Sequence, residues 1–265
     1  MNLPRIRTVI DKEWAEVFKN KLVLFTVGFL PLIFTALPLG IIYATSRGGG
    51  PSAGDMADIP ASFQAMCAGA APSDCLQVYL LNEFLLLFMM MPLIIPVSIA
   101  AYSIVGEKTT RSLEPLLATP ISTIELLTAK GLAAALPAIA ATWLGFAIFL
   151  IGLPLVGGSP AVVGLALSPV WLLAVIVIGP LMSVLAVVFA IMVSSRVSDP
   201  RVAEQTAAVI IVPLLAVLFG QLAGVIVLNV TFMLVAIVFL ALIDIAMVYL
   251  GARLFQREII LTRWK

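Results

Sequence analysis

The chain has 265 residues, of which 62% are hydrophobic and only 11% are charged, and its net charge at pH 7 is +1. A soluble domain carries about a quarter charged residues, so this composition excludes a water-exposed globular chain, and the charge gives no indication of a nucleic-acid partner. The sequence has no histidine, which excludes histidine-based triads, histidine metal sites and haem ligation. Two cysteines are too few for a disulfide scaffold or a four-thiolate metal site.

Apolar blocks of about twenty residues recur along the chain, and a helix of that length crosses the hydrocarbon core of a bilayer. We therefore predict an all-α integral membrane protein with a single transmembrane domain over residues 1–265. Its six spans are expected at about 22–44, 80–104, 131–153, 169–193, 207–228 and 231–252. The boundary between the last two stays open, because the short connection could belong to a tight helical hairpin or to a broken, re-entrant segment.

Lysine and arginine predict the orientation. With the amino terminus inside, every Lys and Arg except Arg47 falls in a cytoplasmic segment, as the positive-inside rule requires. Both termini and residues 105–130 are then cytoplasmic, and residues 45–79 form an extracellular loop. Cys67 and Cys75 lie in this loop, on the oxidising side of the membrane, where a disulfide and two free thiols are both open readings.

Residues 4–21 have apolar side chains at helical spacing, with charged side chains elsewhere on the helix. This pattern predicts an amphipathic helix that lies on membrane lipid at the inner interface, with Trp14 at the depth of the headgroups and the lysines reaching outward. A plain membrane anchor would account for it without a protein partner.

The cytoplasmic segment between the second and third spans carries the most specific local pattern. Ser112 can cap a short helix, and Pro115 then falls in its first turn, where no hydrogen bond is lost. Pro120 ends this helix. A second helix is expected to start at once, because Ser122 and Glu125 have the spacing of a capping box.

The predicted short helix has one apolar ridge, formed by Leu113, Leu116 and Leu117 at positions i, i+3 and i+4. Leucines exposed on such a helix suit docking into a groove of another protein. The alternative is that the ridge packs on this chain's own inner surface. The charged residues around the ridge are Glu107, Lys108, Arg111 and Glu114.

These residues resemble the signature of type-two ABC transporter permeases, above all of the sodium- and drug-exporter branch. That signature reads Glu-Lys, then Thr-Leu-Glu-x-Leu-Leu-x-x-Pro, then Glu-Leu and Gly-Lys; here Ser112 replaces the usual Thr, and Ala129 replaces the Gly before Lys130. Residues 12–31 and residues 195–205, the latter with the pattern Arg-x-x-Asp-x-Arg-x-Ala-x-Gln, are similar to further parts of the family and follow in the same order.

The resemblance implies a permease subunit of an ATP-driven ABC exporter in the plasma membrane of a prokaryote. It also implies a second permease copy, identical or not, and two copies of a separate ATPase subunit that bind ATP and magnesium. The sequence contains no Gly-x-x-x-x-Gly-Lys-[Ser/Thr] loop, so we expect no cofactor, metal or catalytic site in this chain. The short helix would be the coupling helix, and the residues that would contact the ATPase are Glu107, Lys108, Arg111, Leu113, Glu114, Pro115, Leu116, Leu117 and Pro120.

Two carboxylates lie near or within the apolar spans: Glu83 near the outer end of the second and Asp244 inside the sixth. A charge at the bilayer centre costs roughly 2.5 kcal/mol or more. A cation or proton site on a transport path and a structural interhelical hydrogen bond are both open readings, whereas Gln221, between two glycines, indicates close helix packing. A stand-alone secondary transporter or channel remains the alternative function.

Overall fold

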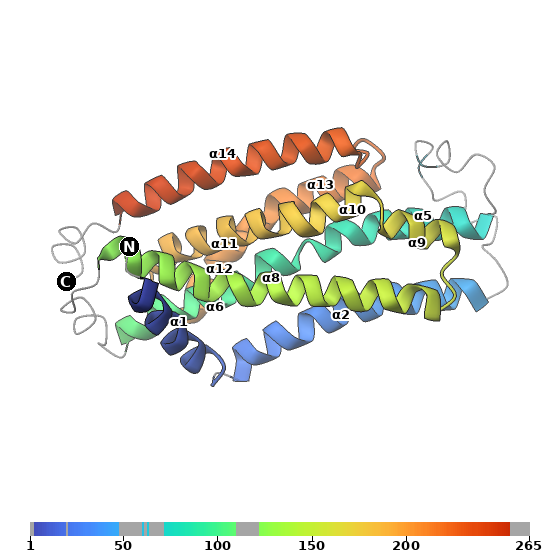
Figure 1. Cartoon of the computed structure of the whole chain (residues 1–265). Helices are drawn as coiled ribbons and strands as arrows, with labels where there is room; N and C mark the ends of the chain where they lie inside the picture. Colours follow the sequence, from blue (N-terminus) through green and yellow to red (C-terminus); the bar gives the residue numbers. More distant parts are fainter. Residues whose placement is uncertain are drawn as a thin grey trace.

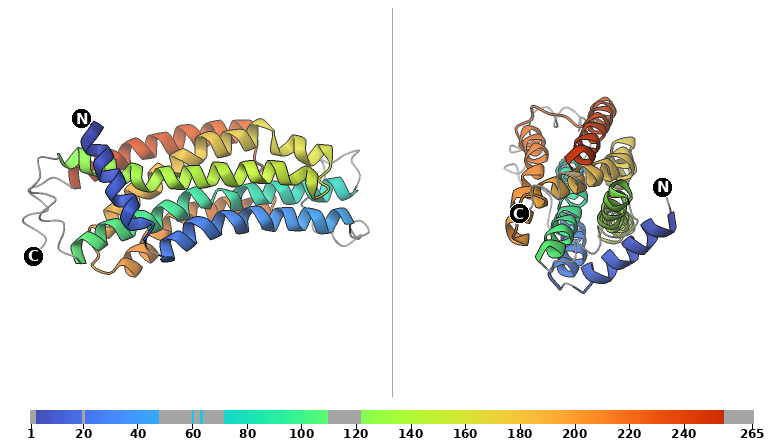
Figure 2. Two further views of the ribbon diagram at one scale, coloured as in Figure 1. Left: turned by 60° about the horizontal axis from the view of Figure 1, so that its bottom comes forward. Right: turned by 90° about the vertical axis from the view of Figure 1, so that its left-hand side faces the viewer.

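The structure, a computed structural model, describes residues 3–19, 21–47, 60, 63, 72–109 and 122–254. These residues are helical apart from short connections, and six of their helical segments are long and apolar enough to cross a membrane. The predicted six-span, all-α architecture is thereby confirmed. The spans lie along a common axis, and helix α1 (Leu3–Val17) crosses one end of the bundle, which we call the α1 end, opposite the far end (Figures 1 and 2).

Three spans are single helices: α2 (Lys21–Arg47), α8 (Thr123–Leu155) and α14 (Val230–Leu254). The others are composite: α5 (Pro72–Phe88) with α6 (Met91–Thr109); α9 (Pro160–Ala166) and α10 (Pro169–Leu173) with the π-helix η1 (Ala174–Ile178) and α11 (Gly179–Ser194); and α12 (Pro200–Ala207) with the 3-10 helix η2 (Ala208–Ile211) and α13 (Val212–Leu222). Helix α1 begins and α14 ends at the same end of the bundle, as an even number of spans requires (Figure 1).

Three of the apolar helical segments differ from the expected spans. The second begins at Asp74 instead of residue 80, the fourth begins at Pro160 instead of residue 169, and the fifth covers Pro200–Leu222 instead of 207–228. The stretch of each segment that crosses a membrane stays a prediction. The predicted loops 45–79 and 105–130 are correspondingly shorter. Polar side chains such as Gln77 lie within the helical part of the second span and are nevertheless buried against other helices, so hydropathy does not mark where this span starts.

The second span forms the centre of the bundle, and 83% of its most apolar stretch is buried inside the protein. The first, fifth and sixth spans are less than one-fifth buried and present apolar faces outward. An aromatic cluster fills the core, where the Trp171 ring stacks on Phe146 and Phe149 at centroid distances of 5.9 and 5.6 Å. The outer faces are suited to lipid or to a further membrane subunit.

Prolines explain the breaks in the composite spans. The chain leaves the helix at Met89–Met90, just before Pro92, which has no N–H to continue the hydrogen-bond ladder. In η1 the carbonyl of Val175 would be paired with the N–H of residue 180, but this residue is Pro180. The indole of Trp143 donates to the Val175 carbonyl instead, at 3.1 Å.

The connection between the last two spans is neither tight nor helical. Residues 223–229 form a turn and an extended stretch, with Gly224 at a φ of 70°, a conformation that favours glycine. Asn229 then caps α14, because its side-chain oxygen accepts the N–H of Phe232 at 2.8 Å.

Near the start of α5, Cys75 is buried together with Phe63. Cys67 lies outside the described residues, so the disulfide between Cys67 and Cys75 stays a prediction. Arg47, the one cation that the sequence places outside the membrane, is the last residue of α2 and lies at the far end of the bundle. Its guanidinium lies 4.6 Å over the ring of Tyr43.

Candidate functional site

Helix α1 docks on protein with the face that the sequence assigns to lipid. Its residues Ile6 and Val9 are buried against Leu126 and Ala129 of α8. The expected amphipathic helix is present, but it packs across the first turns of α8 at the α1 end (Figure 2). A plain lipid anchor would leave this apolar stripe facing the bilayer, so α1 is an integral part of the bundle.

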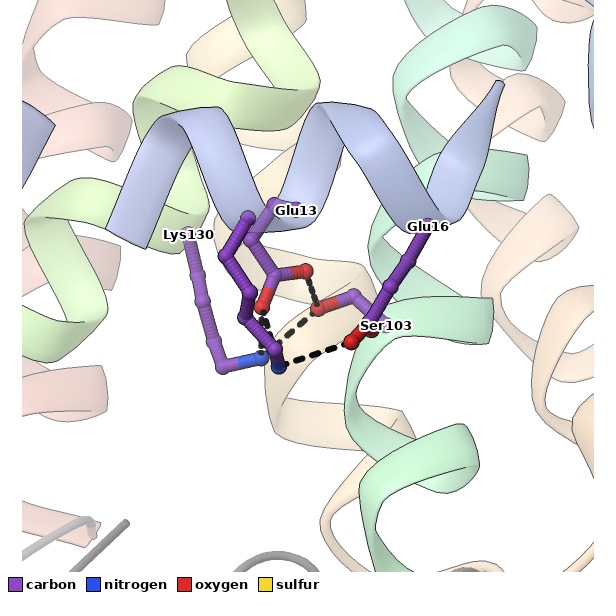
Figure 3. A network of polar contacts seen from close by, with 5 residues as sticks. Glu13, Glu16, Ser103 and Lys130 are labelled. Atoms are coloured by element: carbon purple, nitrogen blue, oxygen red, sulfur yellow. Dashed lines mark hydrogen bonds and ion pairs between the residues drawn. The ribbon is translucent and has the colours of Figure 1, made fainter. Parts of the chain in front are cut away.

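A buried ion pair fixes this docking. The ammonium of Lys130 on α8 lies 2.8 Å from Glu13 Oε1 on α1, and the two side chains are 4% and 2% exposed. Lys130 also donates to the hydroxyl of Ser103 on α6 at 2.8 Å, and Ser103 donates to the other carboxylate oxygen of Glu13. The three side chains close a triangle that joins α1, α6 and α8 (Figure 3). We call it the Glu13 triad.

Two contacts surround the Glu13 triad. Lys12 lies 3.4 Å from Glu13 and 3.5 Å from the more exposed Glu16. The indole of Trp14 donates to the carbonyl of Ala133 at 2.9 Å. This carbonyl would ordinarily accept the N–H of residue 137, which is Pro137 and has none. Pro137 therefore leaves free the carbonyl that fixes Trp14 to α8, and the depth of Trp14 relative to the headgroups stays a prediction.

Several groups set the ionisation of Glu13. Burial by itself raises the pKa of this carboxyl, but the charge of Lys130, hydrogen bonds from Lys130 and Ser103 and the charge of Lys12 outweigh it and hold the pKa below its ordinary value. Glu13 is therefore an anion at neutral pH. The charged form is the one that the triad stabilises.

The acid response of this contact follows from the lowered pKa of Glu13. Ionised Glu13 stabilises the folded state fully above its unfolded-state pKa, which is about 4.3. This stabilisation is lost as the pH falls through the lower folded-state pKa of Glu13. We expect the difference in melting temperature between the wild type and Glu13→Gln to be constant from neutral pH down to about pH 5 and to shrink below it. Thermal unfolding across this range measures the difference, and a difference that grows on acidification would contradict the assignment.

The Glu13 triad holds both helices that lead into the predicted coupling helix. Ser103 lies on α6, which ends at Thr109, and Lys130 lies on α8, which begins at Thr123. The predicted capping box at the start of α8 is confirmed, since Ser122 accepts the Glu125 N–H at 3.2 Å and the Glu125 side chain accepts the Ser122 N–H at 3.0 Å.

The residues of the predicted coupling helix are only partly described. Glu107 and Lys108 belong to the last turns of α6. The other predicted contact residues lie outside the described residues, and their role stays a prediction: Arg111, Leu113, Glu114, Pro115, Leu116, Leu117 and Pro120.

A second serine of α6 binds a second carboxylate. Ser98 donates a hydrogen bond to Glu204 of α12. Ala203 packs beside it against Ala101 and Val105 of α6. Asp199 starts α12 by accepting the N–H groups of the next residues at 2.8 and 3.2 Å. The Arg-x-x-Asp-x-Arg-x-Ala pattern thus contains a helix cap and a close packing position, and α6 is fixed to two peripheral helices.

Sequence reasoning missed the partners of Lys130. Glu13 continues the stripe of Ile6, Val9 and Val17 on α1, and all four residues are buried. A carboxylate on the apolar face of an amphipathic helix is a signal for a buried cationic partner. Ser98, Ser103 and Glu204 carry no comparable signal.

The structure places Glu83 and Asp244 on separate helices, α5 and α14. Both are more than nine-tenths buried, at 8% and 7% exposure. In the part of the chain that is described, neither carboxylate makes a hydrogen bond of ordinary geometry. Glu83 lies beside Gln221 of α13, whereas α14 packs mainly on α11.

The geometry defines a multi-pass membrane protein whose peripheral helix is tied to two central helices. In a comparison with protein families, the family described as ABC-2 family transporter protein matches residues 7–254. The chain belongs to this family and is an ABC transporter permease of the plasma membrane. Members of the family are membrane subunits without a catalytic site of their own and associate with an ABC ATPase. Among curated proteins, none matches the chain.

Proposed function

We propose that this chain is the membrane-spanning subunit of an ABC exporter, which moves its substrate out of the cytoplasm with ATP hydrolysed by two copies of a separate ATPase subunit. ATP and magnesium bind to that partner. The α1 end faces the cytoplasm, as the distribution of Lys and Arg indicates. The observation that carries the proposal is the Glu13 triad, which joins the two helices that flank residues 110–121 to each other and to α1.

The triad supplies a mechanical connection. When the two ATPase subunits close on ATP, they displace the predicted coupling helix within the cytoplasmic segment 105–130. Helices α6 and α8 then move together, because the Lys130–Glu13 pair and Ser103 keep them at a fixed spacing with α1. Helix α12 follows through the Ser98–Glu204 bond. Differential binding of the ATPase to two arrangements of the bundle shifts their populations.

A second permease copy completes the pathway. The apolar faces of α2, α13 and α14 point away from the bundle, and part of this surface meets the partner copy while the rest contacts lipid. The substrate passes between the two copies.

One observation favours the alternative, a stand-alone secondary transporter or channel. Glu83 and Asp244 are buried and make no hydrogen bond of ordinary geometry among the described residues, and intramembrane carboxylates are typical of ion-coupled carriers. Such a carrier needs no ATPase and no exposed docking helix. The family match and the connection at the α1 end favour the ABC permease.

The experiment that tests the proposal determines which end of the bundle faces the cytoplasm. Ser198 is exposed in the α11–α12 connection, whose Val197 packs on α6 at the α1 end, and Ser46 is exposed at the far end. In a chain whose two native cysteines are replaced by serine, we expect Ser198→Cys to react with a membrane-impermeant maleimide only in inside-out vesicles. Ser46→Cys is the matched control and should react only in right-side-out vesicles. The reverse pattern would place residues 110–121 outside the cell and end the proposal.

A further inference from the structure

Two polar side chains meet between α5 and α13 without satisfying each other. Gln221 is completely buried, and Glu83 is 8% exposed. The side chains of Glu83 and Gln221 are close enough to interact, but their contact falls short of ordinary hydrogen-bond geometry, and none of the four polar atoms has another partner within the described residues. Polar atoms buried at this depth are ordinarily paired, because each unpaired one costs on the order of 1–3 kcal/mol.

The described residues of the helices packed against α5 offer no charge to balance an ionised Glu83. Helix α5 packs on α2, α9 and α13, and the sequences of α9 and α13 contain no titratable side chain. On α2 the candidates are Tyr43 and Arg47, both exposed and stacked on each other. On α5 itself, Tyr79 is the nearby titratable group, with Asp74 further toward the helix start.

Comparison with Glu13 shows that Glu83 lacks a cationic partner on the helices packed against α5. Glu13 is buried to a similar extent and receives an ammonium, a hydroxyl and a second lysine. Glu83 has a carboxamide neighbour and no cation. Buried carboxylates in proteins are paired, protonated or bound to a cation, and no protein cation of the packed helices reaches this one.

The chemistry of the pair selects the ligand. A carboxylate and a carboxamide oxygen are hard oxygen donors, suited to a proton or an alkali metal ion rather than to soft metals. Their summed charge is −1, so a single positive charge neutralises the pair, whereas a divalent ion would leave a buried excess.

We propose that Glu83 and Gln221 form a binding site for one monovalent cation, a proton or an alkali metal ion, between α5 and α13. A proton on Glu83 would let the carboxyl donate to Gln221 Oε1 and accept from Gln221 Nε2. A metal ion would take the Glu83 carboxylate and Gln221 Oε1 as ligands. The site lies apart from the Glu13 triad and does not depend on the direction of transport.

The test follows thermal unfolding of the full-length chain in lipid nanodiscs by tryptophan fluorescence. The salts are LiCl, NaCl, KCl and choline chloride at equal ionic strength, each between about pH 5.5 and pH 8.5, the range around neutrality in which a buried carboxyl titrates. If the ligand is a metal ion, we expect one alkali salt to raise the melting temperature over choline by about 5 °C at saturation. If it is a proton, the melting temperature should fall by a similar amount as the pH rises, in all four salts.

The variants decide whether either response belongs to this site. Glu83→Gln keeps the shape and removes the charge, so it should abolish the response. Gln221→Leu removes the second ligand and should abolish or markedly weaken it; it also serves if Glu83→Gln does not fold. All variants are compared in an Asp244→Asn background, which removes the buried carboxylate of α14 and should leave the response of Glu83 intact. Equal responses in this background with and without Glu83→Gln or Gln221→Leu would overturn the proposal and leave a structural contact only.

Discussion

Replacing Lys130 with methionine is expected to lower the free energy of unfolding by about 3–5 kcal/mol, among the largest effects of any single substitution in this chain. The variant leaves the Glu13 carboxylate 2% exposed and without its closest cation. Lys12, at 3.4 Å, compensates in part, so the lower end of the range applies. Reversible unfolding in mixed micelles, followed by tryptophan fluorescence, measures the change.

The double variant separates the ion pair from packing. Glu13→Gln combined with Lys130→Met removes both charges and keeps similar volumes, so we expect it to recover about 2 kcal/mol or more of the loss. Lys12→Met is the matched control: the Lys12 side chain is 35% exposed, and its loss should cost less than about 1 kcal/mol. Small, additive effects of the single variants would show that the Glu13 triad does not hold α1 to the bundle.

The six-span architecture could be predicted because lipid is the solvent for most of the surface, and apolar blocks then mark the spans directly. Apolar blocks do not mark the ends of a span where its helix contacts protein instead of lipid. The second span is the most buried of the six, and it begins at Asp74 and contains Gln77 and Asn82, which face neighbouring helices. Nothing in hydropathy distinguishes such residues from a loop.

The capping box at Ser122 and Glu125 could be predicted because both residues lie within one helical turn. The Glu13–Lys130 pair could not, because its members are 117 positions apart and meet only through the angle at which α1 crosses α8. The indole of Trp14 binds a carbonyl left free by Pro137, and that of Trp143 one left free by Pro180. Each proline is visible in the sequence, but its tryptophan partner comes from packing.

Replacing Leu116 with arginine is the second change expected to have a large effect. Leu113, Leu116 and Leu117 form the predicted ridge of the coupling helix, and residues at the centre of such a docking surface contribute about 2 kcal/mol or more each. A buried, unpaired guanidinium adds a desolvation cost. Affinity for the ATPase subunit should therefore fall by about 30-fold or more, while the Glu13 triad and the six spans keep the permease inserted.

A matched control carries the same substitution at the opposite end of α8. Leu155 is 81% exposed there, and Leu155→Arg should leave binding of the ATPase unchanged. Both variants should reach the membrane in amounts similar to the wild type, which separates a loss of binding from a loss of folding.

Co-purification of the ATPase subunit with the tagged permease tests most directly whether the segment between α6 and α8 receives the work of ATP hydrolysis. We expect the wild type and Leu155→Arg to retain the ATPase through the purification and Leu116→Arg to lose it. Retention of the ATPase by a correctly inserted Leu116→Arg permease would contradict the account.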